Sequence, residues 1–303
     1  MNKKKVSIIM NCHNGEKFLE QSINSVINQS YENWEIIFFD NCSTDKSKNI
    51  CLKFNDKRIR YFKSKKMIKL GLARKIALSK AVGDFIAFLD VDDLWKKNKL
   101  NHQLKYLKKK EVGFSISNSI FFNKENSKYF YDEKKKFKKR VFNDLIKNYF
   151  ISFDTVIIKK EFLNKLDHNI DERFNVIHDM DLLIRLSREC EMSYVPLALS
   201  KWRMTVESDS YNKFKQIINE KKIFIKKISK KYKKNENFIN SKIKFMDILY
   251  RQEILFFLSK RKFLKVLKLI PKLKINYKNI ILILIIFLPF KKYIYNKILN
   301  LKY

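Results

Sequence analysis

Three carboxylates fall within four residues in Asp90–Val91–Asp92–Asp93, directly after a strand pattern at residues 84–89. Carboxylates this close repel one another unless a cation or a hydrogen-bond donor lies among them. Mg²⁺ and other hard cations take oxygen ligands and bridge to substrate phosphates. The cluster therefore fits a metal–diphosphate site, and it fits equally well a solvated acidic loop ahead of Leu94.

Three further polar residues lie at positions where a ligand could meet them. Asp40 ends the strand pattern Trp34–Phe39, where a carboxylate can bind a ribose or a base N–H, although aspartate also forms turns. Arg74, early in the helical pattern Gly71–Ala81, could neutralise a phosphate or lie at the surface. Asp179 precedes an apolar helical stretch, where it could cap the helix or act as a general base whose pKa is tuned by burial.

Strand and helix patterns alternate four times over the first ninety residues. Strands are expected at residues 6–10, 34–39, 58–63 and 84–89, with helical patterns between them. Short helical crossovers imply an α/β fold with a mostly parallel sheet and helices on both faces. Ligands bind beyond the carboxyl ends of such strands. Asn14, Asp40 and Asp90 lie at or just past three of these ends, which predicts one shared site.

The pattern changes near residue 210. Before it, further strands are expected at residues 112–119, 155–158 and 193–201, and helical segments at 96–110 and 180–186. After it, long Lys/Ile/Phe-rich helices carry no acidic cluster. We therefore expect a catalytic domain over residues 1–210 and a basic helical region over residues 211–303.

The charge is large but says little about nucleic acid. The 303 residues hold 66 Lys and Arg against 31 Asp and Glu, a net charge of +35, and 56 of the 66 are Lys. A bidentate reader of bases and phosphates would use more Arg, and the joint excess of Lys, Asn, Ile, Phe and Tyr is typical of an AT-rich genome. No nucleic-acid partner is expected. Residues 211–303 alone carry +21, which indicates contact with an anionic surface.

Other classes are disfavoured by what the sequence lacks. Apolar residues make up 46% of the chain, which is too many for a disordered protein. Its four cysteines show no CxxC spacing and the N-terminus shows no apolar signal segment, so a reducing, cytoplasmic location is expected. No G-x-G-x-x-G follows the first strand, which argues against a dehydrogenase.

Several ordered motifs resemble the family 2 glycosyltransferases. They are VSIIMNCHNGEKFL, WEIIFFDNCSTDKS, GLARKIALSKAVGDFIAFLDVDD, then Trp95 with Leu100 and Gln103, the later HDMDLLIRL, and the segment from Trp202–Arg203 to Ser210. The resemblance covers roughly residues 5–210. It implies a GT-A fold and inverting transfer of a sugar from a nucleotide sugar, with a UDP-sugar favoured, to a glycan or lipid-linked acceptor in surface glycan synthesis.

The resemblance also implies roles for individual residues. Asp92 would hold a divalent cation, Mg²⁺ or Mn²⁺, and Asp179 would take the proton from the acceptor hydroxyl. The base and ribose side of the donor would meet Asn11, His13, Asn14, Asp40 and Asp90, and the diphosphate side would meet Arg74.

Two departures keep alternatives open. His178 stands where the family has an acid, and Thr205 stands where it often has a histidine. These changes motivate a non-catalytic sugar-nucleotide-binding relative, which Asp92 and Asp179 argue against. A metal-dependent phosphohydrolase with an Asp-x-Asp motif is a weaker alternative, because that class places the motif near the N-terminus and has Thr or Val where Leu94 stands.

The basic C-terminal region could contact a membrane. Ile280–Leu288 is a run of nine apolar residues bounded by Pro289 and Lys291–Lys292, too short for the about 20 residues that span a bilayer. Such a run can lie in one leaflet with its lysines at the headgroups. We expect peripheral contact with the cytoplasmic face of an anionic membrane; the alternative is a helical bundle packed on the catalytic domain.

Overall fold

The computed structural model describes residues 4–132, 134–205, 213–274, 276, 279–281 and 283. The chain divides into two compact units. The α/β unit comprises Met1–Leu145 and Tyr149–Ser208, and the helical unit comprises Ile146–Asn148 and Asp209–Tyr303. Each unit is described by itself.

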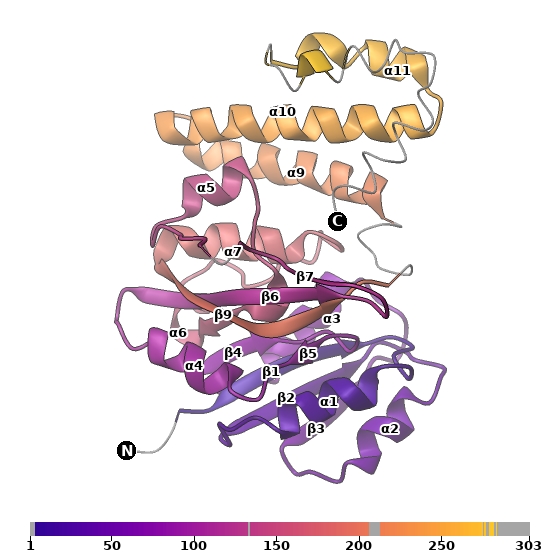
Figure 1. Ribbon diagram of the computed structural model, residues 1–303, viewed down its shortest axis with the longest axis vertical. Coiled ribbons are helices and arrows are strands. Elements are labelled where there is room, and N and C mark those ends of the chain that lie inside the picture. The colour runs from indigo at the N-terminus through magenta and orange to yellow at the C-terminus, as the bar shows by residue number, and fades with distance from the viewer. Residues whose placement is uncertain are drawn as a thin grey trace. The chain divides into compact units, whose positions relative to one another are not determined.

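Four parallel strands form the first half of the sheet in the α/β unit (Figure 1). They are β1 (Val6–Cys12), β2 (Trp34–Asp40), β3 (Ile59–Lys63) and β4 (Phe85–Phe88), in the order β3-β2-β1-β4. Every residue of β1, β2 and β4 is buried, as expected for parallel strands covered on both faces. Cys12 pairs with Asp40 and Ile9 with Phe88, so the carboxyl ends of these strands lie at one edge.

Helices cover both faces of this half. They are α1 (Leu19–Ile27), α2 (Ser47–Lys53) and α3 (Leu70–Ser79). The α1 residues Leu19, Ile23 and Val26 follow helical spacing and are fully buried in one core with β1 and β2. Figure 1 shows α1 and α2 in front of the sheet and α3 behind it.

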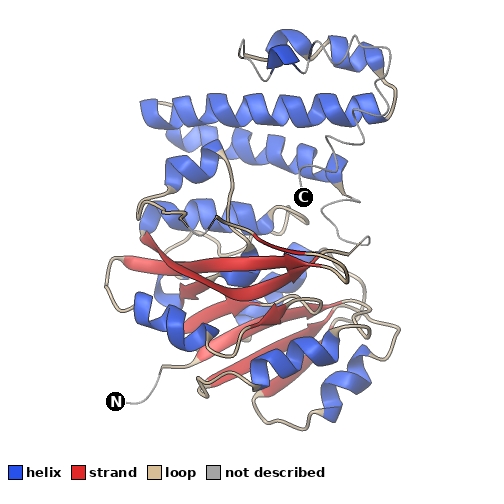
Figure 2. Ribbon diagram, in the orientation of Figure 1, coloured by secondary structure: helices blue, strands red, loops and turns tan. Residues whose placement is uncertain are grey.

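The second half of the sheet is mixed rather than parallel. Its strands are β5 (Leu94–Trp95), β6 (Val112–Phe122), β7 (Ser127–Tyr129), β8 (Ile157–Lys159) and β9 (Glu191–Arg203). Strand β8 is antiparallel to β4 and β6, β6 is parallel to β9, and β5 and β7 form antiparallel edges (Figure 2). The predicted α/β fold is confirmed, and the expected parallel pairing holds for the first four strands and for the β6–β9 pair.

Short helices connect these later strands. They are α4 (Lys99–Tyr106), α5 (Phe142–Lys147), the 3₁₀ helix η1 (Phe153–Thr155), α6 (Lys160–Leu163) and α7 (His178–Glu189). The helix expected over residues 96–110 is shorter, because the chain first forms β5 against β9. Helix α7 begins at His178 and so carries Asp179 in its first turn.

The helical unit is built on two long helices. Its described elements are α9 (Phe214–Tyr232), α10 (Glu236–Ser259), α11 (Phe263–Leu267) and η2 (Ile270–Lys272). The Asn235 side chain caps α10 by accepting from the Phe238 amide at 2.8 Å. Within the described part of the chain, no helix is both long and apolar enough to cross a membrane. Of the predicted membrane-contacting run Ile280–Leu288, residues 282 and 284–288 lie outside the described residues.

Candidate functional site

Two loops at the ends of β1 and β2 are joined by hydrogen bonds from backbone amides to side-chain oxygens. The Asn14 amide donates to Ser43 Oγ at 3.0 Å, and the Thr44 amide donates to Asn14 Oδ1 at 2.9 Å. Asn14 has a φ of 53°, a left-handed conformation that asparagine tolerates. A Cβ on Gly15 would lie 2.8 Å from the Val91 side chain, so the first loop also packs against the acidic segment after β4. Three strand ends therefore share one rim.

The side-chain amide of Asn11 lies at this rim with its hydrogen-bonding capacity unused by the described residues. Its side chain is only 7% exposed, and neither its Nδ2 nor its Oδ1 has a hydrogen-bond partner among the described residues. Leaving a buried polar group unpaired costs about 1–3 kcal/mol, and a bound ligand would remove that penalty. Nearby, exposed His13 places Nδ1 3.1 Å from the Asn41 carbonyl.

Asp40 is fully buried. One carboxylate oxygen accepts from the Ser43 amide at 2.7 Å, and the other accepts from the Tyr61 hydroxyl at 2.6 Å. Asp40 therefore fixes the loop that holds Ser43, and the contact with base or ribose that the resemblance implies stays a prediction for its remaining lone pairs.

Arg74 lies at the centre of the site. Its side chain is 5% exposed, its guanidinium contacts the Asp90 carboxylate and His178 Nε2, and it lies 5.1 Å from the centre of the Phe153 ring. A buried charge needs such partners. The chain brings them together because the Leu70 amide, at the start of α3, donates to Asn175 Oδ1 at 2.7 Å, just ahead of α7.

His178 serves as a neutral partner of Arg74. Burial and the positive charge of Arg74 together hold the pKa of His178 well below its usual value. Its Nδ1 lies 3.2 Å from the Asn175 carbonyl and therefore carries the proton, which leaves the Nε2 lone pair toward Arg74. His178 stands where the resemblance implies an acid. As a neutral imidazole, it does not cancel the positive charge of Arg74.

The three carboxylates of the acidic cluster have different environments. Asp90 is paired with Arg74, and buried Asp93 accepts from the Arg203 amide at 2.9 Å. Asp92 is half-buried, and burial followed by repulsion from Asp90 raises its pKa to about 6. A divalent cation would relieve both effects, so the surroundings of Asp92 fit a metal ligand.

A second group of possible metal ligands lies outside this cluster. Among the described residues, His168, Asp171 and Asp181 offer ligand atoms within 4.8 Å of one another. The carboxylates already pair with arginines, Asp171 with Arg173 at 2.6 Å and Asp181 with Arg185 at 2.7 Å. These pairs account for the cluster as an ion-pair network ahead of and within α7.

Asp179 is held by a residue that the sequence analysis missed. The Tyr149 hydroxyl donates to Asp179 Oδ2 at 3.0 Å. Burial raises the pKa of the half-buried Asp179, while Arg74 and Tyr149 act to lower it. Arg74 also lowers the pKa of Asp92, so one guanidinium acts on both carboxylates. Tyr149 carries no motif, and only the fold places it here.

The buried Lys99 belongs to a hydrogen-bond network that holds η1 next to Arg74. Lys99 is 0% exposed, its amine donates to the Thr155 carbonyl at 2.9 Å, and burial lowers its pKa to about 7. Gln103 donates to the same carbonyl at 2.8 Å, and Trp95 Nε1 donates to the Asp154 carbonyl at 3.1 Å. Together they fix η1, whose Phe153 lies against Arg74.

Comparison with known proteins assigns the chain to a family. The model of "Glycosyl transferase family 2" matches residues 7–167. The chain belongs to glycosyl transferase family 2. It is 34% identical over 218 residues to the UDP-Glc:alpha-D-GlcNAc-diphosphoundecaprenol beta-1,3-glucosyltransferase WfgD of Escherichia coli, a match that covers 70% of this chain and 82% of the relative.

A second relative agrees with this assignment, and two solved structures share the fold. The putative teichuronic acid biosynthesis glycosyltransferase TuaG of Bacillus subtilis is 30% identical, over 69% of this chain and 83% of the relative. The S. aureus TarS structure with UDP has a TM-score of 0.60 at 19% identity, covering 82% of this chain and 71% of that one. The Pyrobaculum calidifontis mannosyltransferase PcManGT, with GDP-Man and Mn²⁺, has a TM-score of 0.60 at 14% identity, covering 83% and 72%.

These matches confirm the predicted family and GT-A fold, and the protein is a glycosyltransferase. The phosphohydrolase alternative is therefore wrong.

Proposed function

We propose that this glycosyltransferase moves a sugar from a UDP-sugar, with inversion, to a hydroxyl of a lipid-linked glycan during synthesis of a cell-surface polysaccharide. The observation that carries the proposal is the buried Arg74, which pairs with Asp90 at the strand ends and whose charge acts on both Asp92 and Asp179. Arg74 is thus surrounded by Asp90 and Asp92, which suit a metal–diphosphate site, and by Asp179, which suits a general base.

The donor is proposed to lie along the rim formed by the strand ends. Asn11 supplies the unpaired amide, His13 and Asn14 line the same loop, and Asp40 holds the neighbouring loop in place. Arg74 faces the diphosphate, where its charge offsets the one that develops on the leaving group.

A divalent cation, Mg²⁺ or Mn²⁺, is proposed at Asp92. When bound, it would stabilise the charge of the departing nucleoside diphosphate without any proton transfer. Relatives of the fold support this, since the PcManGT structure holds GDP-Man with Mn²⁺. We expect Asp92→Ala to abolish metal-dependent nucleotide-sugar binding, as measured by calorimetric titration with and without Mn²⁺.

Asp179 is proposed as the base that takes the proton of the acceptor hydroxyl. Its Oδ2 accepts from the Tyr149 hydroxyl, which orients the carboxylate, and the carboxylate has further lone pairs that can accept the proton of the acceptor hydroxyl. A single displacement assisted by one base inverts the anomeric centre, whereas a retaining path through a covalent intermediate uses a second carboxylate.

The acceptor is proposed to be lipid-linked and presented at the cytoplasmic face of a membrane. The name of the Escherichia coli relative specifies a diphosphoundecaprenol-linked sugar as acceptor. The charge of +21 over residues 211–303, the proposed membrane-contacting region, would favour an anionic surface.

The test is UDP release from UDP-glucose and related donors, with Mn²⁺ or Mg²⁺, in the presence and absence of a lipid-diphosphate-linked N-acetylglucosamine. We expect release that depends on the acceptor, and a rise in melting temperature with UDP because the ligand binds only the folded state. A thermal shift with GDP-mannose but not with any UDP compound would contradict the proposed donor.

A further inference from the structure

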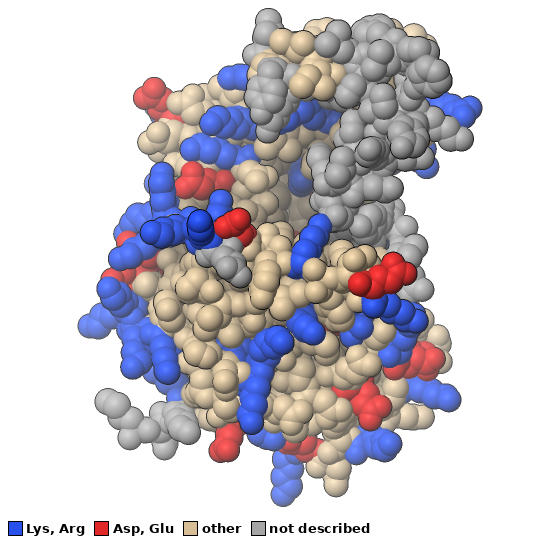
Figure 3. Space-filling view, in the orientation of Figure 1, with Lys and Arg blue, Asp and Glu red and all other residues tan. Residues whose placement is uncertain are grey.

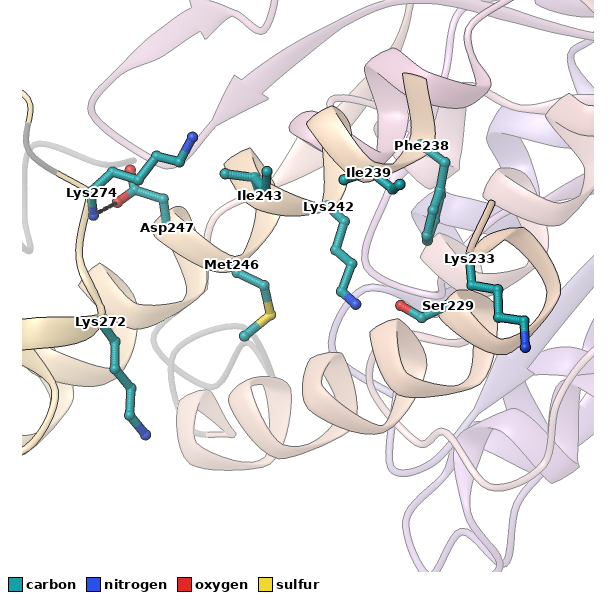
Figure 4. Close-up of a pocket in the computed structure, with 10 residues that line it drawn as sticks. All are labelled: Ser229, Lys233, Phe238, Ile239, Lys242, Ile243, Met246, Asp247, Lys272 and Lys274. Carbon is teal, nitrogen blue, oxygen red and sulfur yellow. Dashed lines mark hydrogen bonds between the residues drawn. The ribbon is translucent and has the colours of Figure 1, made fainter. Parts of the chain in front are cut away.

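The helical unit contains a hollow between its two long helices. It has a volume of about 390 Å³ and adjoins a second, more open one of about 500 Å³. Both hollows are lined by Ser229 and Lys233 on the α9 side and by Lys242 and Met246 of α10. Figure 4 shows Ser229, Lys242 and Met246 between the two helices. We treat the two hollows as one groove.

The floor of the groove is apolar. Ile239, Ile243 and Met246 follow helical spacing on α10, and Ile225 of α9 lines the more open part. Ile239 is 41% exposed, so apolar surface remains in contact with water. Covering such surface is worth about 25 cal/mol per Å².

The rim of the groove is basic. Lys222, Lys226 and Lys230 recur every fourth residue on α9, and Lys233 and Lys242 continue the line. Lys222 pairs with Glu253 at 2.5 Å. The other four have no acidic partner among the residues that the structure describes.

Among the described residues, Asp247 is the one acid that lines the groove, and it does not neutralise this rim. Asp247 pairs with Arg251 at 3.2 Å, and its other oxygen accepts from Asn279 Nδ2 at 2.6 Å and from the Lys274 amide at 3.2 Å. The groove therefore combines an apolar floor with uncompensated positive charge along one side.

We propose that this groove binds a phosphate-bearing lipid, with the hydrocarbon chain on the apolar floor and the phosphate among the α9 lysines. Lysine stems can cover a chain while their ammonium groups meet the phosphate, and each lysine near an anionic lipid surface gains on the order of fivefold in affinity. A nucleic acid would use the lysines but leave the floor exposed. The proposal concerns the helical unit alone and does not depend on the transfer chemistry at Asp179.

The experiment uses the full-length protein and two lipid probes. Monomeric short-chain phosphatidic acid, below its micellar concentration, stands for a single phosphate-bearing lipid, and vesicles with 30% phosphatidylglycerol stand for a bilayer. Inorganic phosphate and pure phosphatidylcholine vesicles lack the chain and the charge, respectively. Binding is measured by calorimetric titration and co-sedimentation, and the UDP-induced thermal shift reports separately on the α/β unit.

One variant pair tests the floor. Ile239→Glu places a charge on the floor, whereas Ile223→Glu, on α9 and 49% exposed, places the same charge outside the groove. Both side chains are exposed enough for the change to be tolerated. We expect at least a tenfold loss of phosphatidic acid binding for Ile239→Glu and no loss for Ile223→Glu.

A second variant pair tests the rim. The combined change Lys226→Gln, Lys230→Gln and Lys233→Gln removes three charges from the groove, and we expect about a hundredfold weaker binding to both lipid probes. The matched control removes three exposed lysines of the α/β unit, Lys48, Lys53 and Lys57, in the same way.

If the protein binds phosphatidic acid but not the anionic vesicles, the groove takes a single lipid molecule, as a lipid-linked acceptor would require. If it also binds the anionic vesicles, the groove takes its lipid from a bilayer. The proposal is overturned if either test variant binds as its control does, or if inorganic phosphate or neutral vesicles bind as tightly as the phosphate-bearing lipid. Loss of lipid binding with an unchanged UDP shift leaves the proposed transfer function intact.

Discussion

Arg74 and the carboxylates around it show what sequence can establish at the level of single residues. The motifs correctly indicate that Asp90, Asp92 and Asp179 belong to segments that fold together, and Arg74 connects those segments. They give no indication that Asp40 is fully buried beneath Tyr61, or that Tyr149 binds Asp179. These contacts join residues 21 and 30 positions apart, and no local pattern encodes them.

Tyr149→Phe tests the hydrogen bond to Asp179. The hydroxyl stabilises the ionised carboxylate, and a hydrogen bond to a charged group contributes about 1.5–3 kcal/mol. Its removal should raise the pKa of Asp179 further above the usual range by about one to two units. The acidic limb of the pH profile of kcat/KM should therefore move to higher pH. A profile that keeps its position while activity falls would instead indicate a purely structural role for Tyr149.

Arg74→Lys tests the planar guanidinium. A lysine ammonium cannot contact Asp90 and His178 from one position as the guanidinium does. We expect kcat/KM for the donor to fall about tenfold in steady-state kinetics, with a loss in kcat, because Arg74 offsets charge that develops on the leaving group. Lys75→Gln, which removes an exposed cation on the same helix, is the control. Equal effects of the two changes would show that only general charge matters.

At the scale of elements, local pattern predicts strands in both halves of the sheet, but it predicts the strand order and direction only for the first half. Strands β1, β2 and β4 are short apolar runs buried on both faces, and the helices between them enforce parallel order. Strand β8 has three residues and β5 has two, and both are defined by antiparallel pairing with distant strands. The strand expected at residues 155–158 overlaps β8, whereas the two residues of β5 carry too little periodicity to be found from sequence.

Lys99→Met tests the buried network beneath the site. Because burial lowers the pKa of Lys99 in the folded protein to about 7 from 10.5, the unfolded chain binds more protons between these values. The free energy of unfolding of the wild type should thus rise with pH, by up to about 1.4 kcal/mol per unit.

Methionine fills a similar volume and does not titrate, and Gln103 still donates to the Thr155 carbonyl. The difference in unfolding free energy between wild type and Lys99→Met should therefore shift in favour of the wild type, by about 2 kcal/mol, from pH 7 to pH 9. Urea denaturation of both proteins at pH 7 and pH 9 measures this difference in unfolding free energy. A constant difference would mean that Lys99 is protonated to the same extent in the folded and the unfolded protein, so that burial does not lower its pKa.

At the scale of the whole molecule, the large net positive charge should determine how stability depends on salt. A net charge of +35 on 303 residues repels itself in the compact state. Salt screens this repulsion over about 10 Å at 0.1 M. We expect the melting temperature to rise by several degrees between 50 and 300 mM NaCl in differential scanning fluorimetry. A fall over this range would show that attractive ion pairs outweigh the net repulsion.

The most direct test of the account is Asp179→Asn, because asparagine keeps the shape of the side chain and removes the base. The variant should bind UDP-sugar and Mn²⁺ as the wild type does, with the same thermal shift. Acceptor-dependent UDP release should fall by about 10²- to 10⁴-fold. Release within a few-fold of the wild type would contradict the assignment of Asp179 as the base, and with it the proposed single-displacement mechanism.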